Sequence, residues 1–448
     1  MLGPKAQPFM RDDRGSLALG RLGGPDARRR LAGSPPCLVT PAHTGTGLGV
    51  VRDLGRLGVP IIAADSDAHA IGLASRYALP AAVRDPFCDE AGFIDDLLRI
   101  GEALPRRAVL FPCCDDHVWA VSRHVERLRE HFLVPIAGWG VMARLADKGL
   151  QLQAARQAGV DIPQTLLLHS PADLKSAEDG IPFPAVLKST GHREMKRRLG
   201  VKVLLVRDAD ELSGAYRQAS ICGPLMLQEV IPGDDDGLYS FGAYHDASSR
   251  PLGVFCARKL RQHPRGFGQA RLVEGRWSDD VADASLRLLA ELSFHGVSET
   301  EFRRDPRDGR LKLMEVNARH WLFHSLARRA GVNLSWIAYL DALGLPVPDT
   351  QQVDGLFWLD GARDVRDSVA EIVRGQMSAL TWLSTLRSVR VDAVCSLDDW
   401  GPVVRSLTNQ ARRAGGHVCV PRRSDGDRNA SQAAVAAEPA VLMPAPSD

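Results

Sequence analysis

Val297-Ser-Glu299-Thr-Glu301-Phe-Arg-Arg304, Asp305-Pro-Arg-Asp-Gly309 and Arg310-Leu-Lys-Leu-Met-Glu315-Val-Asn317 follow one another without a break. Two strand-like segments flank a turn rich in Asp, Pro and Gly, which predicts a β-hairpin. Side chains alternate between the two faces of a strand, so Glu299 and Glu301 share one face, as do Glu315 and Asn317. The hairpin therefore gathers three carboxylates and an amide on a single surface.

The pairing register of this hairpin decides how close its acidic side chains come. A register that begins directly at the turn places Glu315 opposite Glu299 and Glu301 opposite Leu313. Glu301 and Glu315 are then diagonal neighbours, about 7–8 Å apart. A slip of two residues would keep the same side chains on the same face.

Carboxylates this close repel one another unless a cation joins them. Oxygen ligands from one or two carboxylates, completed by phosphates and water, are typical of magnesium bound with a nucleotide, and manganese accepts the same ligands. The alternative is a solvated strand face. Apolar Met314 and Val316 on the opposite face, and the polar continuation Asn317-Ala-Arg319, weigh against that alternative.

Two lysines stand out because only eight of the 56 basic residues are lysines. Lys148 lies in a segment, 142–158, that is predicted to be one helix. Lys188 ends the apolar strand Ala185-Val-Leu187 and precedes a basic, glycine-bearing loop over 189–200. Such a loop can fold over phosphates, although each lysine taken alone is as well explained as a surface charge.

A fourth candidate is the apolar strand Leu225-Met-Leu-Gln-Glu-Val-Ile231, which turns at Pro232-Gly233 into three aspartates. A strand that ends in this way is expected to leave backbone groups unpaired at Glu229 to Ile231. These groups could read the edge of a purine, and a nearby acid could accept ribose hydroxyls. By itself the pattern is only a strand end with an acidic turn.

A glycine-rich turn, His43-Thr-Gly45-Thr-Gly47-Leu-Gly49, lies between a predicted strand and a predicted helix. Asp65 follows 20 residues after Gly45, where a nicotinamide-binding fold keeps an acid for the ribose. The spacing G-x-G-x-G departs from the dinucleotide pattern G-x-G-x-x-G. A nicotinamide-dependent oxidoreductase, a carboxylate-binding turn and a purely structural turn all remain open here.

Composition limits the classes of protein that need be considered. The 448 residues are 45% hydrophobic and 25% charged, with a formal net charge of +2. So small a charge excess argues against a general nucleic-acid binder, and no apolar run approaches the ~18 residues of a membrane span. Eight scattered cysteines without a CxxC pair predict a reducing, cytoplasmic compartment.

The order of elements predicts the fold class. Strands alternate with helices over 37–146, which indicates an α/β, Rossmann-like domain with a parallel sheet. Mixed strands and helices over 147–345 indicate a second, α+β domain of two subdomains. A helical segment is expected over 346–420, between a disordered arm at 1–36 and a disordered tail at 421–448.

In this order the motifs resemble the ATP-grasp superfamily, over about residues 37–345. The matching segments are Asp147-Lys148, Pro184-Ala-Val-Leu-Lys188, Gln228-Glu-Val-Ile-Pro-Gly233, the Glu301 strand and Glu315-Val-Asn-Ala-Arg319. Within it the chain is most similar to the ATP-dependent carboxylate–amine ligases, the D-aspartate ligase-like branch. Arg258-Lys-Leu-Arg-Gln-His-Pro264 and Trp321-Leu-Phe-His-Ser-Leu-Ala327 carry that finer resemblance. The first domain then corresponds to the pre-ATP-grasp domain.

The resemblance implies a carboxylate–amine, or carboxylate–thiol, ligase that uses ATP and two Mg²⁺ ions, forms an acyl phosphate and releases ADP and phosphate. Its expected partners are small-molecule carboxylate and amine substrates. It implies metal ligation by Glu301, Glu315 and Asn317. It implies nucleotide binding by Lys148, Lys188, Gln228, Glu229, Val230, Ile231 and Asp236. It implies contact of Arg319, Arg261 and Lys259 with the transferring phosphate. A homodimer and a non-catalytic ATP-binding protein are left open.

Overall fold

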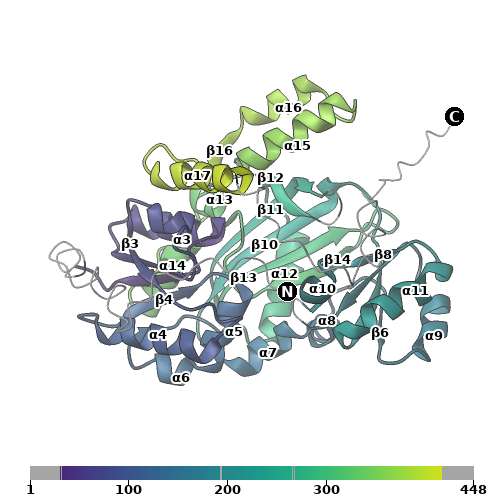
Figure 1. The fold of residues 1–448 in the computed structure, drawn as a ribbon, viewed down its shortest axis with the longest axis horizontal. Helices are drawn as coiled ribbons and strands as arrows, with labels where there is room; N and C mark the ends of the chain where they lie inside the picture. Colours follow the sequence, from purple (N-terminus) through teal and green to yellow (C-terminus); the bar gives the residue numbers. More distant parts are fainter. Residues whose placement is uncertain (1–30, 32, 192–193, 265, 267, 416–448) are drawn as a thin grey trace. The chain divides into compact units, whose positions relative to one another are not determined.

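The computed structural model describes residues 31, 33–191, 194–264, 266 and 268–415 (Figure 1). The chain divides into two units, residues 1–405 and residues 406–448, and every site below lies in the first. The arm predicted at 1–36 and the tail predicted at 421–448 fall almost wholly outside the described residues. Leu31, however, is buried, and the carbonyl of Pro35 accepts a hydrogen bond from the Tyr339 hydroxyl.

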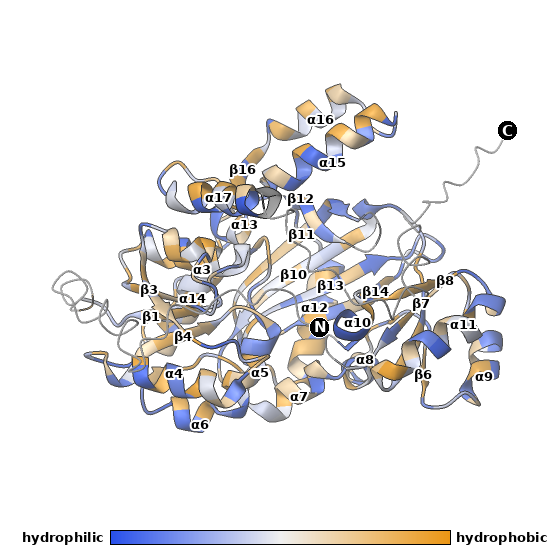
Figure 2. Ribbon diagram, in the orientation of Figure 1, coloured by the Kyte–Doolittle hydropathy of each residue, from blue (hydrophilic) through white to orange (hydrophobic). Residues whose placement is uncertain are grey.

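The first sheet has five parallel strands in the order β3-β2-β1-β4-β5. Its strands are β1 (Cys37–Thr40), β2 (Ile61–Asp65), β3 (Ala78–Ala82), β4 (Ala108–Pro112) and β5 (Phe132–Leu133). Its helices are α3 (Gly45–Gly55), η1 (Ile71–Ala74), α4 (Glu90–Glu102), α5 (Asp115–Arg123) and α6 (Val125–Leu128). The predicted parallel α/β domain is therefore observed, with apolar strands between its helices (Figure 2).

A four-stranded antiparallel sheet follows, in the order β6-β9-β7-β8. Its strands are β6 (Thr165–Leu168), β7 (Ala185–Ser189), β8 (Leu204–Val206) and β9 (Leu225–Glu229). Its helices are α9 (Asp173–Gly180), α10 (Glu194–Leu199), α11 (Ala209–Ala219) and η2 (Ser220–Cys222). Leu187 and Leu227 pair across β7 and β9 and are fully buried, so this small sheet has a core of its own.

Two helices precede this small sheet where one was predicted. They are α7 (Trp139–Ala146) and α8 (Lys148–Gln157). Asp147 has an extended backbone between them, and its side chain caps α8 by accepting from the Leu150 N–H. An N-cap residue cannot continue the preceding helix. Lys148 therefore lies at the start of a helix rather than in the middle of one.

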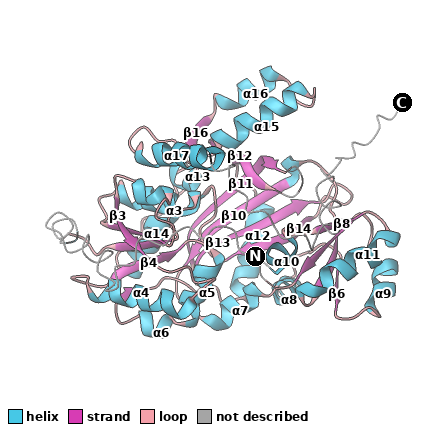
Figure 3. Cartoon of the chain, in the orientation of Figure 1, coloured by secondary structure: helices cyan, strands magenta, loops and turns pink. Residues whose placement is uncertain are grey.

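The largest sheet has seven strands in the order β14-β13-β10-β11-β12-β15-β16 (Figure 3). Five are β10 (Leu238–His245), β11 (Pro251–His263), β12 (Gln269–Gly275), β13 (Gly296–Arg304) and β14 (Leu311–Asn317), all antiparallel to their neighbours. Further elements are η3 (Asp235–Gly237), α12 (Asp279–Glu291), α13 (His324–Arg329) and α14 (Leu334–Ala342). Phe241, Phe302 and Leu288 belong to one core in which α12 packs against this sheet.

The segment expected to be helical, 346–420, also contributes strands. β15 (Phe357–Leu359) pairs antiparallel with β12, and β16 (Val389–Asp392) pairs parallel with β15. The helices are α15 (Gly361–Val373), α16 (Ala379–Leu386) and α17 (Gly401–Gly415). β15 has three residues and β16 has four, which is too short for an alternating pattern to be recognised in sequence. These strands form because β15 pairs with the open edge of β12 and β16 then pairs with β15. None of the described helices is long and apolar enough to cross a membrane.

The register predicted for the acidic hairpin is wrong. Glu301 lies directly opposite Glu315, and Glu299 lies opposite Asn317. An irregularity between Glu301 and Phe302 shifts the pairing by one residue, so that the register near the turn differs from the register at the acidic end. Such a bulge cannot be read from a regular alternation of side chains. The two glutamates are consequently direct cross-strand partners rather than diagonal neighbours.

Candidate active site

The acidic end of the β13–β14 hairpin forms the centre of the candidate site. Glu301 is partly buried, Glu315 is exposed, and Glu299 is buried on the same face. Direct partners on adjacent strands have Cβ atoms only about 4.5–5.5 Å apart. Two facing carboxylates at this spacing destabilise the sheet unless a cation lies close to them.

Lys259 of β11 supplies one such cation. Its Nζ lies 2.6 Å from Oε2 of Glu301, and its side chain is almost completely buried. Burial lowers the pKa of Lys259, but the carboxylates of Glu301 and Glu299 outweigh burial and raise it above its usual value. Lys259 is therefore a fixed positive charge beside the acidic pair.

The buried position of Glu299 shifts the pKa of its carboxyl group. Its pKa is raised to about 8, chiefly by burial and also by the neighbouring charge of Glu301, while Lys259 opposes the rise. Its Oε2 accepts a hydrogen bond from Nδ2 of Asn317 at 3.2 Å. The amide nitrogen of Asn317 thus faces Glu299, and its oxygen faces Arg319.

Arg319 continues this chain of polar contacts. Its Nη2 donates to Oδ1 of Asn317 at 3.0 Å, and its Nε donates to Oδ1 of Asp115 at 2.6 Å. Asp115 begins α5 of the first domain, directly after β4. The guanidinium therefore connects the carboxyl end of the parallel sheet to the acidic hairpin.

Lys188, in β7 of the small sheet, also lies near the acidic hairpin, because Glu315 is one of the charges that act on it. Its Nζ donates to Oε1 of Gln228 at 2.8 Å, and Gln228 is buried in β9. The pKa of Lys188 is lowered to about 7, chiefly by burial and also by the charge of Lys148, while Glu315 opposes the fall. Two lysines that repel each other beside a carboxylate make a position where an anion would relieve the repulsion.

The donor set is suited to a hard cation. The side chains of Glu301, Glu315 and Asn317 contain oxygen atoms, which is the ligand type that Mg²⁺ prefers, and Oδ1 of Asn317 already accepts from Arg319. Within the described ranges, no group of three or more His, Cys, Asp or Glu side chains is arranged to hold a metal ion. A cation bound by these three side chains would therefore need phosphate oxygens or water as further ligands.

Two predicted residues have other partners. Arg261 forms a two-pronged ion pair with Asp364 of α15, with Nε to Oδ1 at 2.9 Å and Nη2 to Oδ2 at 3.0 Å. The pairing of β11 with β12 shifts between Lys259 and Arg261, so that these two side chains do not share one environment. The contacts of Arg261 place it with α15 rather than with Glu301. Asp236 accepts from Nη2 of Arg258 at 2.8 Å.

The predicted hinge after β9 is more fully paired than expected. The N–H of Glu229 donates to the carbonyl of Gln164, and the N–H of Val230 donates to the carbonyl of Pro184. The prediction that both groups are unpaired is therefore wrong, because neighbouring segments extend beyond the sheet and meet them. Ile231 is buried at the same place.

The Glu229 side chain reveals a residue that the sequence did not single out. Its carboxylate accepts from the N–H of Gln164 at 2.8 Å and from Nη2 of Arg307 at 2.8 Å. Arg307 lies in the turn of the β13–β14 hairpin and also binds Asp305 through two nitrogens. Two nearly buried carboxylates thus share one half-exposed guanidinium. In sequence Arg307 is an ordinary turn residue, and no local signal marks it.

Loss of Arg307 should weaken nucleotide binding by changing the hinge. In the Arg307→Ala variant, Glu229 and Asp305 keep their negative charges without the shared cation, so the hinge should move away from the hairpin. We expect the Kd for Mg–ATP to rise about tenfold, since a hydrogen bond to a charged group contributes ~1.5–3 kcal/mol. Titration calorimetry measures this change.

Arg310→Ala is the matched control for this prediction. Arg310 lies three residues away in the same hairpin and forms an exposed ion pair with Asp161. Exposed pairs contribute little, so nucleotide affinity should be unchanged. Equal affinities for wild-type protein and Arg307→Ala would show that the shared guanidinium does not position the hinge.

The glycine-rich turn does not offer Asp65 to a ligand. Oδ2 of Asp65 accepts from the N–H of His43 at 2.7 Å and lies 2.9 Å from its Nδ1. Oδ1 accepts from the N–H of Asp67 at 2.8 Å, and the Asp65 side chain is fully buried. The hydrogen bond to Asp65 raises the pKa of His43. Asp65 therefore stabilises the end of the strand. Its carboxylate oxygens already have partners, so it does not present the free acceptor that a nicotinamide-dependent oxidoreductase needs for the ribose hydroxyls.

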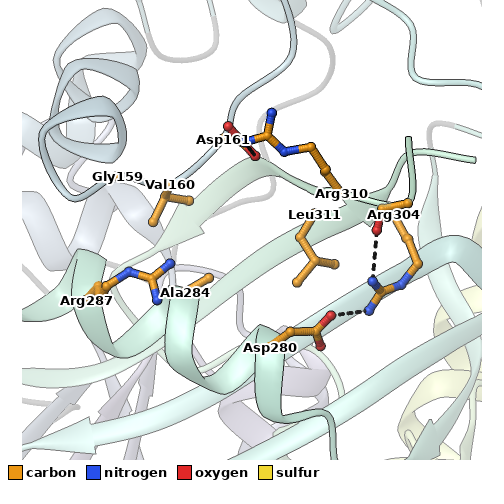
Figure 4. A pocket seen from close by; sticks show the side chains of 10 residues that line it. Gly159, Val160, Asp161, Asp280, Ala284, Arg287, Arg304, Arg310 and Leu311 are labelled. Carbon is orange, nitrogen blue, oxygen red and sulfur yellow. Dashed lines mark hydrogen bonds and ion pairs between the residues drawn. The ribbon is translucent and has the colours of Figure 1, made fainter. Parts of the chain in front are cut away.

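A cavity of about 240 Å³ lies away from the acidic end of the hairpin (Figure 4). It is lined by residues of α12 and of the β13–β14 turn, including Arg287, Arg304 and Arg310. Arg304 is paired with Asp280 and Arg310 with Asp161. None of the residues predicted for nucleotide or metal binding lines this cavity, so we assign it no part in the chemistry.

The parallel sheet, the small antiparallel sheet and the large sheet with its acidic hairpin together define the ATP-grasp fold. Solved structures agree: N5-carboxyaminoimidazole ribonucleotide synthetase from Thermus thermophilus has a TM-score of 0.55 at 18% identity, covering 71% of this chain and 80% of that one. The L-amino acid ligase from Bacillus licheniformis has a TM-score of 0.52 at 16% identity, covering 71% and 74%.

Two curated proteins extend this likeness to sequence. The D-aspartate ligase of Enterococcus faecium is 23% identical over 272 residues, 57% of this chain and 63% of its own length. The D-alanine–D-alanine ligase of Ralstonia pickettii is 23% identical over 204 residues, 45% and 60%. The chain thus spans less than two thirds of either relative, and no family model matches it. The resemblance to the ATP-grasp ligases is confirmed.

Proposed function

We propose that this protein is an ATP-dependent ligase that joins a carboxylate to an amine, or to a thiol, and releases ADP and phosphate. The observation that carries the proposal is the meeting of Glu301 and Glu315 with Lys259 and Lys188, four charged side chains from three strands of the large sheet and one of the small sheet. Facing carboxylates suit a metal ion, and flanking lysines suit the phosphates of a nucleoside triphosphate that binds with it. The relatives named above are ligases, which supports the same reading.

The nucleotide is proposed to lie between the small sheet and the acidic hairpin. Lys148 and Lys188 would contact its phosphates, and the anion would relieve the repulsion between them. Gln228 would hold Lys188 in place through their hydrogen bond. The segment Glu229–Ile231 would border the adenine, with contacts from groups other than the two paired N–H groups, and Asp236 would lie near the ribose.

Magnesium is proposed to bind Glu301, Glu315 and Asn317, with two ions as the implied number and Mn²⁺ as a substitute. When bound, the metal would neutralise phosphate charge. For the Asn317 oxygen to serve as a ligand, the Arg319 guanidinium that now binds it has to give way or share it. Lys259 would remain beside Glu301 as a fixed charge.

The chemistry follows from the weakness of a carboxylate as an electrophile. Transfer of the γ-phosphoryl group converts its oxygen into a leaving group, and the amine then displaces phosphate. Lys259 and Arg319 would stabilise the negative charge that develops in both steps. The basic segment after Lys188 would exclude water, which would otherwise hydrolyse the acyl phosphate. Arg261 would act only indirectly, by fixing β11 against α15.

The domain limits 37–146 for the first domain and 147–345 for the ATP-grasp domain stay part of this proposal. Asp147 and Lys148 lie at the junction between α7 and α8, which gives the boundary a structural marker. The test is limited digestion followed by mass measurement, with cleavage expected near this junction rather than inside either sheet.

The products of the reaction test the proposed mechanism. With amino acids screened as both carboxylate donors and amine acceptors, turnover should release ADP and phosphate. Hydroxylamine should intercept the activated carboxylate as a hydroxamate, which a colorimetric iron assay detects. AMP and pyrophosphate as products would contradict an acyl phosphate. Reactions without magnesium provide the control and should give no product.

A further inference from the structure

Arg319 is held from two domains at once. On the side of the first domain, its Nε and Nη2 donate to the two carboxylate oxygens of Asp115, at 2.6 and 3.2 Å. On the side of the acidic hairpin, its Nη2 also donates to Oδ1 of Asn317 at 3.0 Å. Its Nη1 donates to the carbonyl of His320 at 3.1 Å. A guanidinium has five N–H groups, so these contacts leave one of them without a partner among the described residues.

The carboxylates of the acidic hairpin attract the same guanidinium. Burial lowers the pKa of Arg319, but the charges of Asp115 and then of Glu299 and Glu315 outweigh burial and raise that pKa. Glu315 is exposed and forms no ion pair within the described ranges. Opposite charges attract each other more strongly in a partly buried site than they do in water. Arg319 would therefore move onto Glu315 if nothing held it back.

Asp115 supplies that restraint from the first domain. It is the first residue of α5, after the N-cap Cys114, and α5 follows β4 of the parallel sheet. A carboxylate that binds a guanidinium through both oxygens fixes the plane of the group as well as its position. The anchor of Arg319 thus belongs to a different sheet from the carboxylates that attract it.

We propose that Asp115 is a positioning residue, whose carboxylate keeps the Arg319 guanidinium away from the proposed metal ligands of the hairpin. Without it, the guanidinium would pair with Glu315 and hold Asn317 more tightly, in competition with a divalent cation. With it, Arg319 can release Asn317 and remain in the site, with its unpartnered N–H turned to use on a phosphate. This inference rests on the proposed function, because it concerns the metal proposed there.

Binding of Mn²⁺ together with a non-hydrolysable ATP analogue tests the proposal without turnover. The paramagnetic resonance signal of free Mn²⁺ gives the amount bound, after subtraction of the amount that the analogue binds alone. Asp115→Asn keeps the size of the side chain and removes its charge. We expect its Kd for Mn²⁺ to rise about tenfold, because the guanidinium loses a charged hydrogen-bond partner and moves to the hairpin. A wild-type protein that binds no Mn²⁺ with the analogue would contradict the proposed function, and this inference with it.

Glu90→Gln is the matched control. Glu90 is likewise the first residue of a helix in the first domain, α4, and it binds the guanidinium of Arg123 through both oxygens. Its substitution removes the same kind of ion pair, so the melting temperature reports the purely structural effect in both variants. The Kd for Mn²⁺ should stay unchanged, because Glu90 contacts Arg123 and His124 rather than Arg319. A similar rise of this Kd in Glu90→Gln would reduce the role of Asp115 to stability and overturn the proposal.

The Arg319→Ala background separates positioning from a direct action of Asp115 on the metal. Without the guanidinium Asp115 has nothing to hold back, so the Asp115→Asn, Arg319→Ala double variant should bind Mn²⁺ as tightly as Arg319→Ala alone. Circular dichroism shows that each variant is folded. Equal Kd values for the wild-type protein and Asp115→Asn would overturn the proposal. So would a loss of Mn²⁺ affinity that persists when Asp115→Asn is made in the Arg319→Ala background.

Discussion

Replacing Glu315 with glutamine should lower turnover by about two to three orders of magnitude while the melting temperature stays close to that of the wild-type protein. The side chain is exposed and keeps its size, so no core contact is lost. What is lost is one of two facing carboxylates that the proposed metal requires. The rate of ADP release and the thermal unfolding curve measure the two effects.

Glu301→Gln should have the same effect on turnover through the opposite strand. It should also release Lys259, whose Nζ lies 2.6 Å from Glu301. The control is Lys312→Met, which removes a charge from the same hairpin at a side chain that pairs with Asp308 near the turn. This variant should keep its activity. Full activity in both glutamine variants would mean that the carboxylates form a solvated strand face without a metal.

Replacing Lys188 with methionine should raise the Kd for Mg–ATP by at least tenfold and reduce turnover further. The variant keeps the apolar stem and removes the ammonium group that burial and Lys148 hold in an unfavourable charged state. A phosphate close to Lys188 would favour the charged ammonium group and raise its pKa, so the contact between Lys188 and the phosphate should be strong in the nucleotide complex. Calorimetric titration gives the affinity, and Lys175→Met, in α9, serves as the control.

The same lysine predicts a proton uptake on binding. Its pKa of about 7 in the free protein leaves it largely neutral at pH 8. A bound phosphate should raise that pKa, so nucleotide binding at pH 8 should take up close to one proton. Titrations in buffers with different ionisation enthalpies measure the number. Lys188→Met should show no such uptake, and equal uptake by wild-type protein and variant would remove Lys188 from the phosphate site.

Burial of Lys188 also has a consequence for stability. In the unfolded chain its pKa is 10.5, and in the folded protein without ligand it is about 7. The unfolded state therefore binds the proton more tightly between these values, and the contribution of Lys188 to the free energy of unfolding rises with pH across that window. This contribution should disappear in Lys188→Met.

Much of the fold could be predicted from sequence because its periodic segments are long or sharply bounded. The alternation of strands and helices predicted over 37–146 is observed, with β1 to β5 as the strands and α3 to α6 among the helices. β3, Ala78–Ala82, has no strand signal in sequence, because Ala-Leu-Pro-Ala-Ala contains a proline and no β-branched residue. The open edge of β2 pairs with it, and this partner is not visible in local sequence.

The candidate site divides in a similar way. Some of its residues could be found because they lie in strands with recognisable patterns, namely Glu301, Glu315, Asn317 and Lys188. The register of the hairpin could not be predicted, because an irregularity between Glu301 and Phe302 shifts the pairing. Long-range partners were also out of reach: Asp115 and Arg319 are separated by 204 positions, and Arg261 and Asp364 by 103. Only the folded chain brings these charges together.

The central claim is that a metal–nucleotide complex binds where the acidic hairpin meets the lysines of the small sheet. Calorimetric titration of the wild-type protein and the Glu301→Gln, Glu315→Gln double variant, with ATP in the presence and absence of magnesium and with NAD, tests it most directly. The account predicts tight binding of ATP by the wild-type protein only with magnesium, loss of that magnesium dependence in the double variant, and no binding of NAD. Binding of NAD, or ATP binding that is indifferent to both magnesium and the two glutamates, would contradict it.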